Sequence, residues 1–330
     1  MSGRILVGSC SWVDKTLVES GWYPREAKSP EDRLRYYSQR FPLVEVDSTY
    51  YAVPLPRNPE LWVERTPADF TFDVKSYGLF THHASAVAAL PKELREALPA
   101  KLQAKRNVYY KDLPPETGEA LWRRFVQALL PMDSAGKLGF VLFQFPPWFV
   151  PSRANREYIL EAKGRLGQYQ MAVEFRNGMW MAQQEDQAQT LRFLRDNGIP
   201  YVCVDEPQGF KSSVPPVLAA TAPVAVLRMH GHNSEMWTKK AATAAERFDY
   251  LYSGEELAEW APRIRRLAEE SREVHVLMNN CHRDYAVRNA REIGEMLGVL
   301  AMGHETRDGK HETSDGQPAS ESRVEQAELL

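Results

Sequence analysis

Leu43-Val44-Glu45-Val46-Asp47-Ser48-Thr49-Tyr50-Tyr51 alternates apolar and polar side chains, and this stretch decides the fold class. In a β-strand, Val44 and Val46 would face one side and Glu45 and Asp47 the other, because successive side chains point to opposite faces. A buried carboxylate is costly unless other polar groups meet it. The pattern is therefore typical of a barrel strand with an apolar face against helices and a polar face toward a lumen.

Seven further segments have strand-like patterns, and helical patterns lie between most of the strands. The eight expected strands are residues 5–12, 43–50, 71–77, 138–145, 169–176, 200–206, 224–230 and 274–280. The expected helices are residues 30–37, 58–65, 119–130, 153–165, 184–197, 253–271 and 284–298. This alternation predicts right-handed βαβ units and a parallel sheet. Eight strands in such a chain predict an α/β fold, a single (β/α)₈ TIM-type barrel over residues 1–300.

A doubly wound open sheet is the alternative architecture. It calls for a glycine-rich phosphate-binding turn after an early strand, and Gly8-Ser9-Cys10-Ser11-Trp12 is not such a turn. Residues 84–118 and 231–252 depart from the barrel repeat, and we expect them to extend over the strand ends as loops or lids. Residues 301–330 are rich in Gly, Ser, Glu and Asp, which predicts a disordered C-terminal tail.

Composition and charge narrow the class of protein. The 330 residues carry a net charge of −3, so no overall basic field points to nucleic acid or an anionic membrane. The chain contains no apolar run of transmembrane length, and its first residues lack the layout of a signal peptide. The three cysteines are widely separated, which favours reduced thiols. We therefore expect a cytoplasmic enzyme-sized protein with no membrane partner.

Alternation along all strands predicts a polar lumen. The residues expected to point inward are Glu45, Asp47, Asp73, Lys75, Gln144, Glu174, Arg176, Asp205, Arg228, His230 and Asn279. Isolated buried charges cost several kcal/mol each, so these groups must form a network, bind a ligand, or do both. Several of them fall at the C-terminal ends of their strands, where the active sites of barrels lie.

These residues predict an enzyme for a small, polyhydroxylated, anionic substrate, such as a sugar phosphate or a nucleotide fragment. Glu174 and Asp205 are the expected acid/base pair. Lys75 is expected to act as a cation beside an anionic group, since surrounding carboxylates should raise its pKa and disfavour Schiff-base chemistry. The residues expected to bind the substrate are Arg176 and Arg228 on the anion, Trp12 and Tyr50 as stacking walls, and Asp47, Gln144, His230, Asn279 and Asn280 as hydrogen-bonding groups.

Three alternatives stay open. Glu174 with Arg176 could instead be an internal ion pair that fixes the barrel, and Arg228 could pair with a carboxylate beside a hydrogen-bonded His230. No cofactor is predicted, but a divalent metal is a candidate, and with it a metal-dependent phosphodiesterase or endonuclease. Basic stretches at 101–111 and 237–247 could grip phosphates, although nucleic acid is the less favoured partner. The third alternative is a non-catalytic barrel that binds a metabolite or a partner.

The order of the motifs resembles the domain of unknown function 72 family, also called YecE-like proteins. The matching motifs include Glu45-Val46-Asp47-Ser48-Thr49-Tyr50-Tyr51, Phe72-Asp73-Val74-Lys75, Leu142-Phe143-Gln144-Phe145-Pro146-Pro147, Val173-Glu174-Phe175-Arg176, Asp205-Glu206-Pro207 and Arg228-Met229-His230-Gly231. The resemblance spans roughly residues 4–298 and implies a barrel similar to the sugar-isomerase and endonuclease IV type, without an established activity. The family usually has Gly where this chain has Ser11, and Phe where it has Tyr50 and Met278. A serine in place of glycine bears on how tight the turn after the first strand can be.

Overall fold

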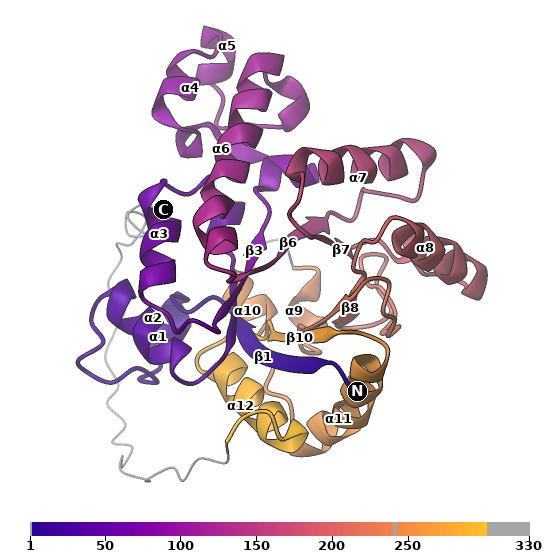
Figure 1. Cartoon of the computed structure of the whole chain (residues 1–330). Helices are drawn as coiled ribbons and strands as arrows, with labels where there is room; N and C mark the ends of the chain where they lie inside the picture. Colours follow the sequence, from indigo (N-terminus) through magenta and orange to yellow (C-terminus); the bar gives the residue numbers. More distant parts are fainter. Residues whose placement is uncertain (1, 240–242, 302–330) are drawn as a thin grey trace.

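The computed structural model describes residues 2–239 and 243–301 (Figure 1). Eight parallel strands form one sheet in the order β7-β6-β3-β2-β1-β10-β9-β8. The strands are β1 (Arg4–Cys10), β2 (Leu43–Val46), β3 (Thr71–Lys75), β6 (Leu138–Phe145), β7 (Met171–Phe175), β8 (Val202–Asp205), β9 (Val224–Met229) and β10 (Glu273–Met278). All eight lie within the expected segments to within a residue or two. The predicted tail covers residues 301–330, and of these 302–330 lie outside the described residues.

The two edge strands meet, so the sheet is a nearly closed barrel. Val173 of β7 forms a parallel bridge with Tyr201, directly before β8. The amide of Val173 donates to the carbonyl of Pro200 at 2.9 Å. The predicted α/β barrel is confirmed, and the open sheet is wrong.

Helices cover the outside of most strands, as the hydrophobic patterns predict. The longer helices are α2 (Pro30–Ser38), α3 (Arg57–Glu64), α6 (Pro115–Ser134), α7 (Arg153–Leu166), α8 (Gln184–Asp196), α11 (Gly254–Glu269) and α12 (Tyr285–Leu297). The start of α2 shows why a helix begins there. Ser29 Oγ accepts a hydrogen bond from the amide of Asp32, the Asp32 carboxylate accepts one from the amide of Ser29, and Pro30 occupies the first turn.

One crossover has no helix. Residues 206–223 connect β8 to β9, all of them are described, and none is helical. This segment packs back on the strand that it leaves. Thr221 Oγ1 accepts from the amide of Tyr201 at 2.7 Å, and the amide of Ala219 lies 3.5 Å from Cys203 Sγ. A loop thus covers the outer face of β8, so this face need not be apolar as it is on strands that pack against helices.

The two irregular segments contain secondary structure. Residues 84–118 hold the antiparallel pair β4 (Ser85–Ala86) and β5 (Asn107–Val108), with α4 (Lys92–Glu96) and α5 (Ala100–Gln103) beside the start of α6 (Figure 1). Residues 231–252 include α9 (Ser234–Trp237) and α10 (Ala244–Arg247). Trp237 and Phe248 of this second segment pack on side chains at the strand ends, as expected of a covering loop.

Aromatic and aliphatic side chains fill the space between the strands and the helices. Phe80 stacks on Trp122 of α6 with the ring centres 3.8 Å apart, and Phe145 stacks on Phe149 at 3.9 Å. Across the described ranges we find no helix with the length and apolar character needed to cross a membrane. Cys10, Cys203 and Cys281 are free thiols.

Candidate active site at the C-terminal end of the barrel

A buried arginine holds the centre of the lumen. Arg228 of β9 is fully buried, and its guanidinium makes two parallel bonds to Glu45 of β2, Nε–Oε2 at 2.9 Å and Nη2–Oε1 at 2.8 Å. Its Nη1 donates to Glu174 Oε2 of β7 at 2.5 Å. The predicted inward direction of all three residues is confirmed. One cation therefore ties together strands that lie on different sides of the barrel.

Glu174 is a fixed carboxylate. Its second oxygen, Oε1, accepts from Arg176 Nε at 2.6 Å and from Gln144 Nε2 at 2.7 Å. Burial alone would raise the pKa of Glu174, but the guanidiniums of Arg176 and Arg228 hold it well below the usual range. A carboxylate that is ionised throughout the physiological range is an anchor for arginines, because a general acid has to carry a proton.

Arg176 extends the network toward the barrel mouth. Its Nη1 donates to Glu206 Oε2 at 2.6 Å, and its Nη2 lies 3.0 Å from His230 Nε2. His230 Nδ1 lies 2.7 Å from the side-chain nitrogen Nδ2 of Asn279. Burial and the charge of Arg176 lower the pKa of His230 to about 3. His230 is therefore a neutral member of this cluster.

Glu206 is the residue that sequence reasoning missed. It follows β8 directly, is buried, and accepts hydrogen bonds from Arg176 and from the amide of Val214 at 2.8 Å. Burial raises the pKa of Glu206 to about 7, although Arg176 opposes this shift. A carboxyl group that titrates near neutral pH can both give and take a proton under working conditions. Glu206 directly follows Asp205 in the sequence, and the alternation of side chains predicted that Asp205 and not Glu206 faces the lumen.

The prediction that Asp205 faces the lumen is wrong. In the parallel register Val204 pairs with the inward Arg228, and Asp205 pairs with the outward Met229. Paired residues of neighbouring strands share a face, so Val204 and the following Glu206 point inward. Because Val202, Cys203 and Val204 of β8 are all apolar, the sequence does not show which of them face the lumen and which face outward. The loop that replaces a helix outside β8 lets this strand place a carboxylate on its outer face.

Asp205 and Asn280 belong to a second cluster, outside the lumen. Asp205 accepts from Tyr252 Oη at 2.7 Å and lies 2.9 Å from His232 Nε2. Asn280 donates to the carbonyl of Tyr250 and to Asn289 Oδ1 of α12, both at 2.9 Å. These contacts hold the 231–252 segment against the barrel. The structure therefore does not bring Asn280 together with Glu174 and Arg176, and the expected acid/base pair of Glu174 and Asp205 is not assembled.

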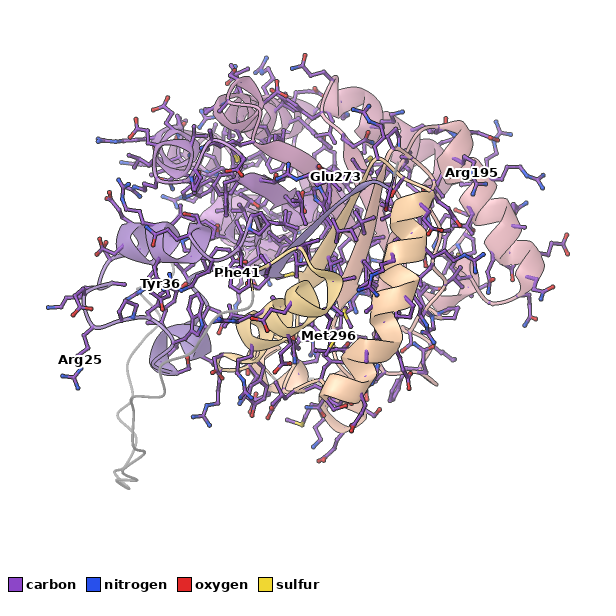
Figure 2. The ribbon with its side chains drawn as sticks, turned by 60° about the horizontal axis from the view of Figure 1, so that its bottom comes forward. Arg25, Tyr36, Phe41, Arg195, Glu273 and Met296 are labelled. Carbon is purple, nitrogen blue, oxygen red and sulfur yellow. The ribbon has the colours of Figure 1, made fainter. Side chains whose placement is uncertain are left out.

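A separate charged layer lies toward the N-terminal ends of the strands. Asp73 of β3 points inward as predicted, and its Oδ2 lies 2.8 Å from His275 Nδ1. His275 Nε2 lies 2.7 Å from Glu273 Oε1 at the start of β10. Glu273 is labelled in Figure 2. Burial alone would lower the pKa of His275, but the two carboxylates raise it to about 9. The alternation of Glu273, His275 and Leu277 could have revealed this layer.

Lys75 and Asp47 lie at the mouth. Lys75 Nζ lies 4.8 Å from the centre of the Tyr50 ring, a cation–π contact. Burial and the charge of Arg228 lower the pKa of Lys75, and they outweigh the carboxylates of Glu45, Glu174 and Asp47, which raise it as expected. Burial also raises the pKa of Asp47 to about 6 against the charge of Lys75. Both groups are half-buried and electrostatically coupled.

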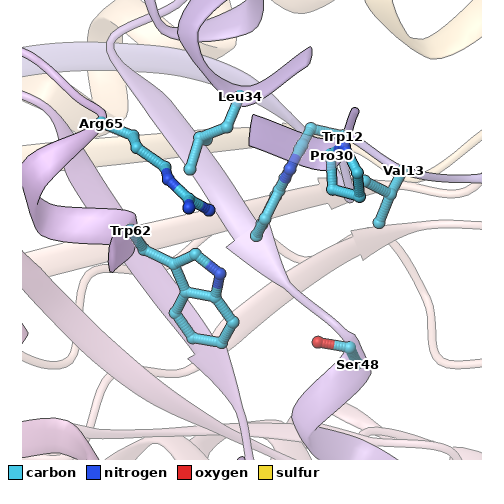
Figure 3. Close-up of a pocket in the computed structure, with 7 residues that line it drawn as sticks. All are labelled: Trp12, Val13, Pro30, Leu34, Ser48, Trp62 and Arg65. Atoms are coloured by element: carbon cyan, nitrogen blue, oxygen red, sulfur yellow. The ribbon is translucent and has the colours of Figure 1, made fainter. Parts of the chain in front are cut away.

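Trp12 packs within the outer shell. Its side chain is 5% exposed and meets Trp62 of α3 edge to face, with the ring centres 5.9 Å apart. Trp12 and Trp62 line a cavity of about 40 Å³ together with Leu34 of α2 and Arg65 (Figure 3). A cavity of this size holds a water molecule and excludes a sugar or a base. This packing leaves no open Trp12 face at the mouth for the predicted stacking wall.

Three of the carboxylates that could bind a metal have other partners. Glu45 and Glu174 bind Arg228, and Asp205 binds Tyr252 and His232. Within residues 2–239 and 243–301, no group of three or more His, Cys, Asp or Glu side chains is arranged to hold a metal ion. The residues of the lumen therefore do not fit a dication, and the buried guanidinium would repel one.

A family model, one Bacillus protein and two crystal structures are similar to this chain, and their names state no activity. The family model "Protein of unknown function DUF72" matches residues 6–312. UPF0759 protein YunF of Bacillus subtilis is 32% identical over 303 residues, which are 91% of this chain and 96% of YunF. The crystal structure of a DUF72 family protein from Thermotoga maritima matches with a TM-score of 0.69 and 32% identity, covering 89% of this chain and 99% of that one. A DUF72 family protein from Enterococcus faecalis matches with a TM-score of 0.72 and 25% identity, covering 94% and 100%.

Proposed function

Since this chain belongs to the DUF72 family, a family of unknown function, we propose a function from its own geometry. The barrel is an enzyme that binds a small, anionic, polyhydroxylated substrate at Lys75 and transfers a proton with Glu206. The substrate class comprises sugar phosphates and nucleotide fragments. Arg176, Gln144 and Asn279 border the same end of the barrel, where their nitrogens are held by Glu174, Glu206 and His230.

The state of Lys75 carries this proposal. The inward arginines are paired, since Arg228 contacts two carboxylates and Arg176 contacts two. Lys75 Nζ makes no hydrogen bond or ion pair with the described residues, and it is half-buried over Tyr50. A partly desolvated cation that forms no hydrogen bond or ion pair gains most from an anion that enters the site. Phosphate and carboxylate groups meet this need.

Glu206 supports a chemical role rather than simple binding. Its pKa near 7 lies close to the pH at which proton transfer is most effective. Arg176 contacts Glu206, Glu174 and His230, so a change of charge on Glu206 alters the electrostatic interactions of all three of these neighbours. In this scheme Glu174 orients Arg176, Arg176 positions Glu206, and Glu206 exchanges the proton with the substrate.

Calorimetric titration tests the binding step. Ribose 5-phosphate, glucose 6-phosphate and adenosine 5′-monophosphate are titrated into the protein, each beside its unphosphorylated form. We expect at least one phosphorylated compound to bind, and we expect Lys75→Gln to weaken it about tenfold or more, since a charge-assisted bond contributes about 1.5–3 kcal/mol. Lys92→Gln, an exposed lysine of α4, is the matched control. No binding, or equal binding to Lys75→Gln, contradicts the proposal.

A further inference from the structure

A row of aromatic rings borders the mouth next to Lys75. We propose that this row stacks a flat heteroaromatic ring of the substrate, so that the ligand is a nucleoside monophosphate with its phosphate at Lys75. This inference rests on the proposed function and narrows the substrate class to the nucleotide branch.

The row consists of Tyr51, Tyr50, His83 and Trp148. Neighbouring ring centres lie 5.2, 5.4 and 5.7 Å apart, and each ring meets the next edge to face. The two ends of the row are open, since Tyr51 is 57% exposed and Trp148 is 59% exposed. Large aromatic side chains usually bury most of their surface, so an exposed pair in one continuous row is a candidate contact surface.

The topology of the barrel places this row beside the cations. Tyr50 and Tyr51 follow β2, His83 follows β3, and Trp148 follows β6, and these strands are neighbours in the sheet. Arg176 directly follows the next strand, β7. Burial lowers the pKa of His83 to about 4, and the charges of Lys75, His82 and Arg176 add to this shift. Lys75 and Arg176 thus act on one neutral ring in the middle of the row.

The hydrogen-bonding capacity of the mouth favours a flat ring over a sugar. Sugars need several donors and acceptors for their hydroxyl groups, and at this mouth many are in use. Glu174 accepts through both oxygens, all three nitrogens of Arg176 have partners, and Asn279 faces His230. A base needs mainly a ring face, because stacking is tolerant of the substituents on the base. The exposed surface of the row is aromatic, which suits stacking of a base.

Binding of adenosine 5′-monophosphate and ribose 5-phosphate to the same protein tests this inference. We expect the nucleotide to bind about tenfold more tightly, since stacking of one base contributes about 1–3 kcal/mol. Trp148→Ala should remove this preference and leave the affinity for ribose 5-phosphate unchanged, while Trp148→Phe should retain most of it. Leu130→Ala, an exposed apolar residue of α6, is the control and should change neither affinity.

The outcomes separate this inference from the proposed function. If ribose 5-phosphate binds through Lys75 as tightly as the nucleotide, or if Trp148→Ala weakens both equally, the ring row is not a base-stacking site and the proposed function stands. If adenosine binds as tightly as its monophosphate, the row is not linked to Lys75, and the inference fails. If no phosphorylated compound binds, both fail.

Discussion

Arg228 and Glu45 form a two-bonded ion pair inside the barrel, with N–O distances of 2.9 and 2.8 Å. They come from β9 and β2, which are separated by β1 and β10 in the sheet. Because Arg228 also binds Glu174 of β7, a single side chain links three strands across the lumen. The lumen is thus a structural network at its centre, and the proposed chemistry lies at the mouth.

Removal of Arg228 should destabilise the protein strongly. Arg228→Met leaves Glu45 and Glu174 buried without their guanidinium, and breaking a buried pair costs about 3–5 kcal/mol. The free energy of unfolding in urea at pH 7 measures this loss. Arg153→Met, which removes an exposed pair with Glu157, should change stability by less than about 0.5–1 kcal/mol. Equal effects of the two substitutions would show that the lumen network does not stabilise the fold.

Ser11 should be a point of backbone strain. Its φ of 76° lies in the left-handed region, which disfavours residues with a Cβ. Ser11→Gly and Ser11→Ala both lose the hydroxyl that accepts from the amide of Val13, but the glycine variant alone loses the Cβ. We expect the glycine variant to be about 1 kcal/mol more stable than the alanine variant. Thermal unfolding of the pair measures the difference, and a more stable alanine variant contradicts it.

His275 should make stability depend on pH on the alkaline side. Its pKa is raised to about 9 in the folded protein, above the value of about 6.5 for an unfolded chain. The ion pairs with Asp73 and Glu273 therefore stabilise fully below about pH 6.5, and this contribution is lost as the pH rises to about 9. Unfolding midpoints across this window should fall in the wild type. A parallel fall in His275→Gln would assign the effect to another group.

Glu206 should titrate near neutral pH. Carbon-detected NMR of selectively labelled glutamate side chains should give a midpoint near 7 for the resonance that disappears in Glu206→Gln. Arg176→Met should move this midpoint upward, since the guanidinium favours the ionised form. A midpoint near the ordinary glutamate value of about 4.3 would remove Glu206 as the proton-transferring residue.

Long periodic segments made most of the fold predictable. The alternation of Val44, Glu45, Val46 and Asp47 identified the lumen face of β2, and similar patterns identified Glu174, Arg176 and Arg228. Each of these strands has apolar residues on one face and charged residues on the other, so its phase is fixed by the cost of buried charge. Residues on such strands were placed correctly without knowledge of their partners.

The sequence misled where a strand was apolar on both faces. Val202, Cys203 and Val204 allow either phase, so Asp205 was assigned to the lumen and Glu206 was missed. The partners of the charged residues depend on distances between strands, which no local pattern contains. The sequence also did not predict that a loop without a helix packs on β8, because residues 206–223 contain no pattern that indicates this contact.

The most direct test of an anion site at Lys75 is a crystal structure of the protein soaked with tungstate, which mimics phosphate and scatters anomalously. We expect an anomalous peak at the barrel mouth within ion-pair distance of Lys75 Nζ, and we expect it to disappear in Lys75→Gln crystals soaked identically. A mouth without a peak in the wild type, or an unchanged peak in the variant, would contradict the assignment of Lys75 as the anion-binding group.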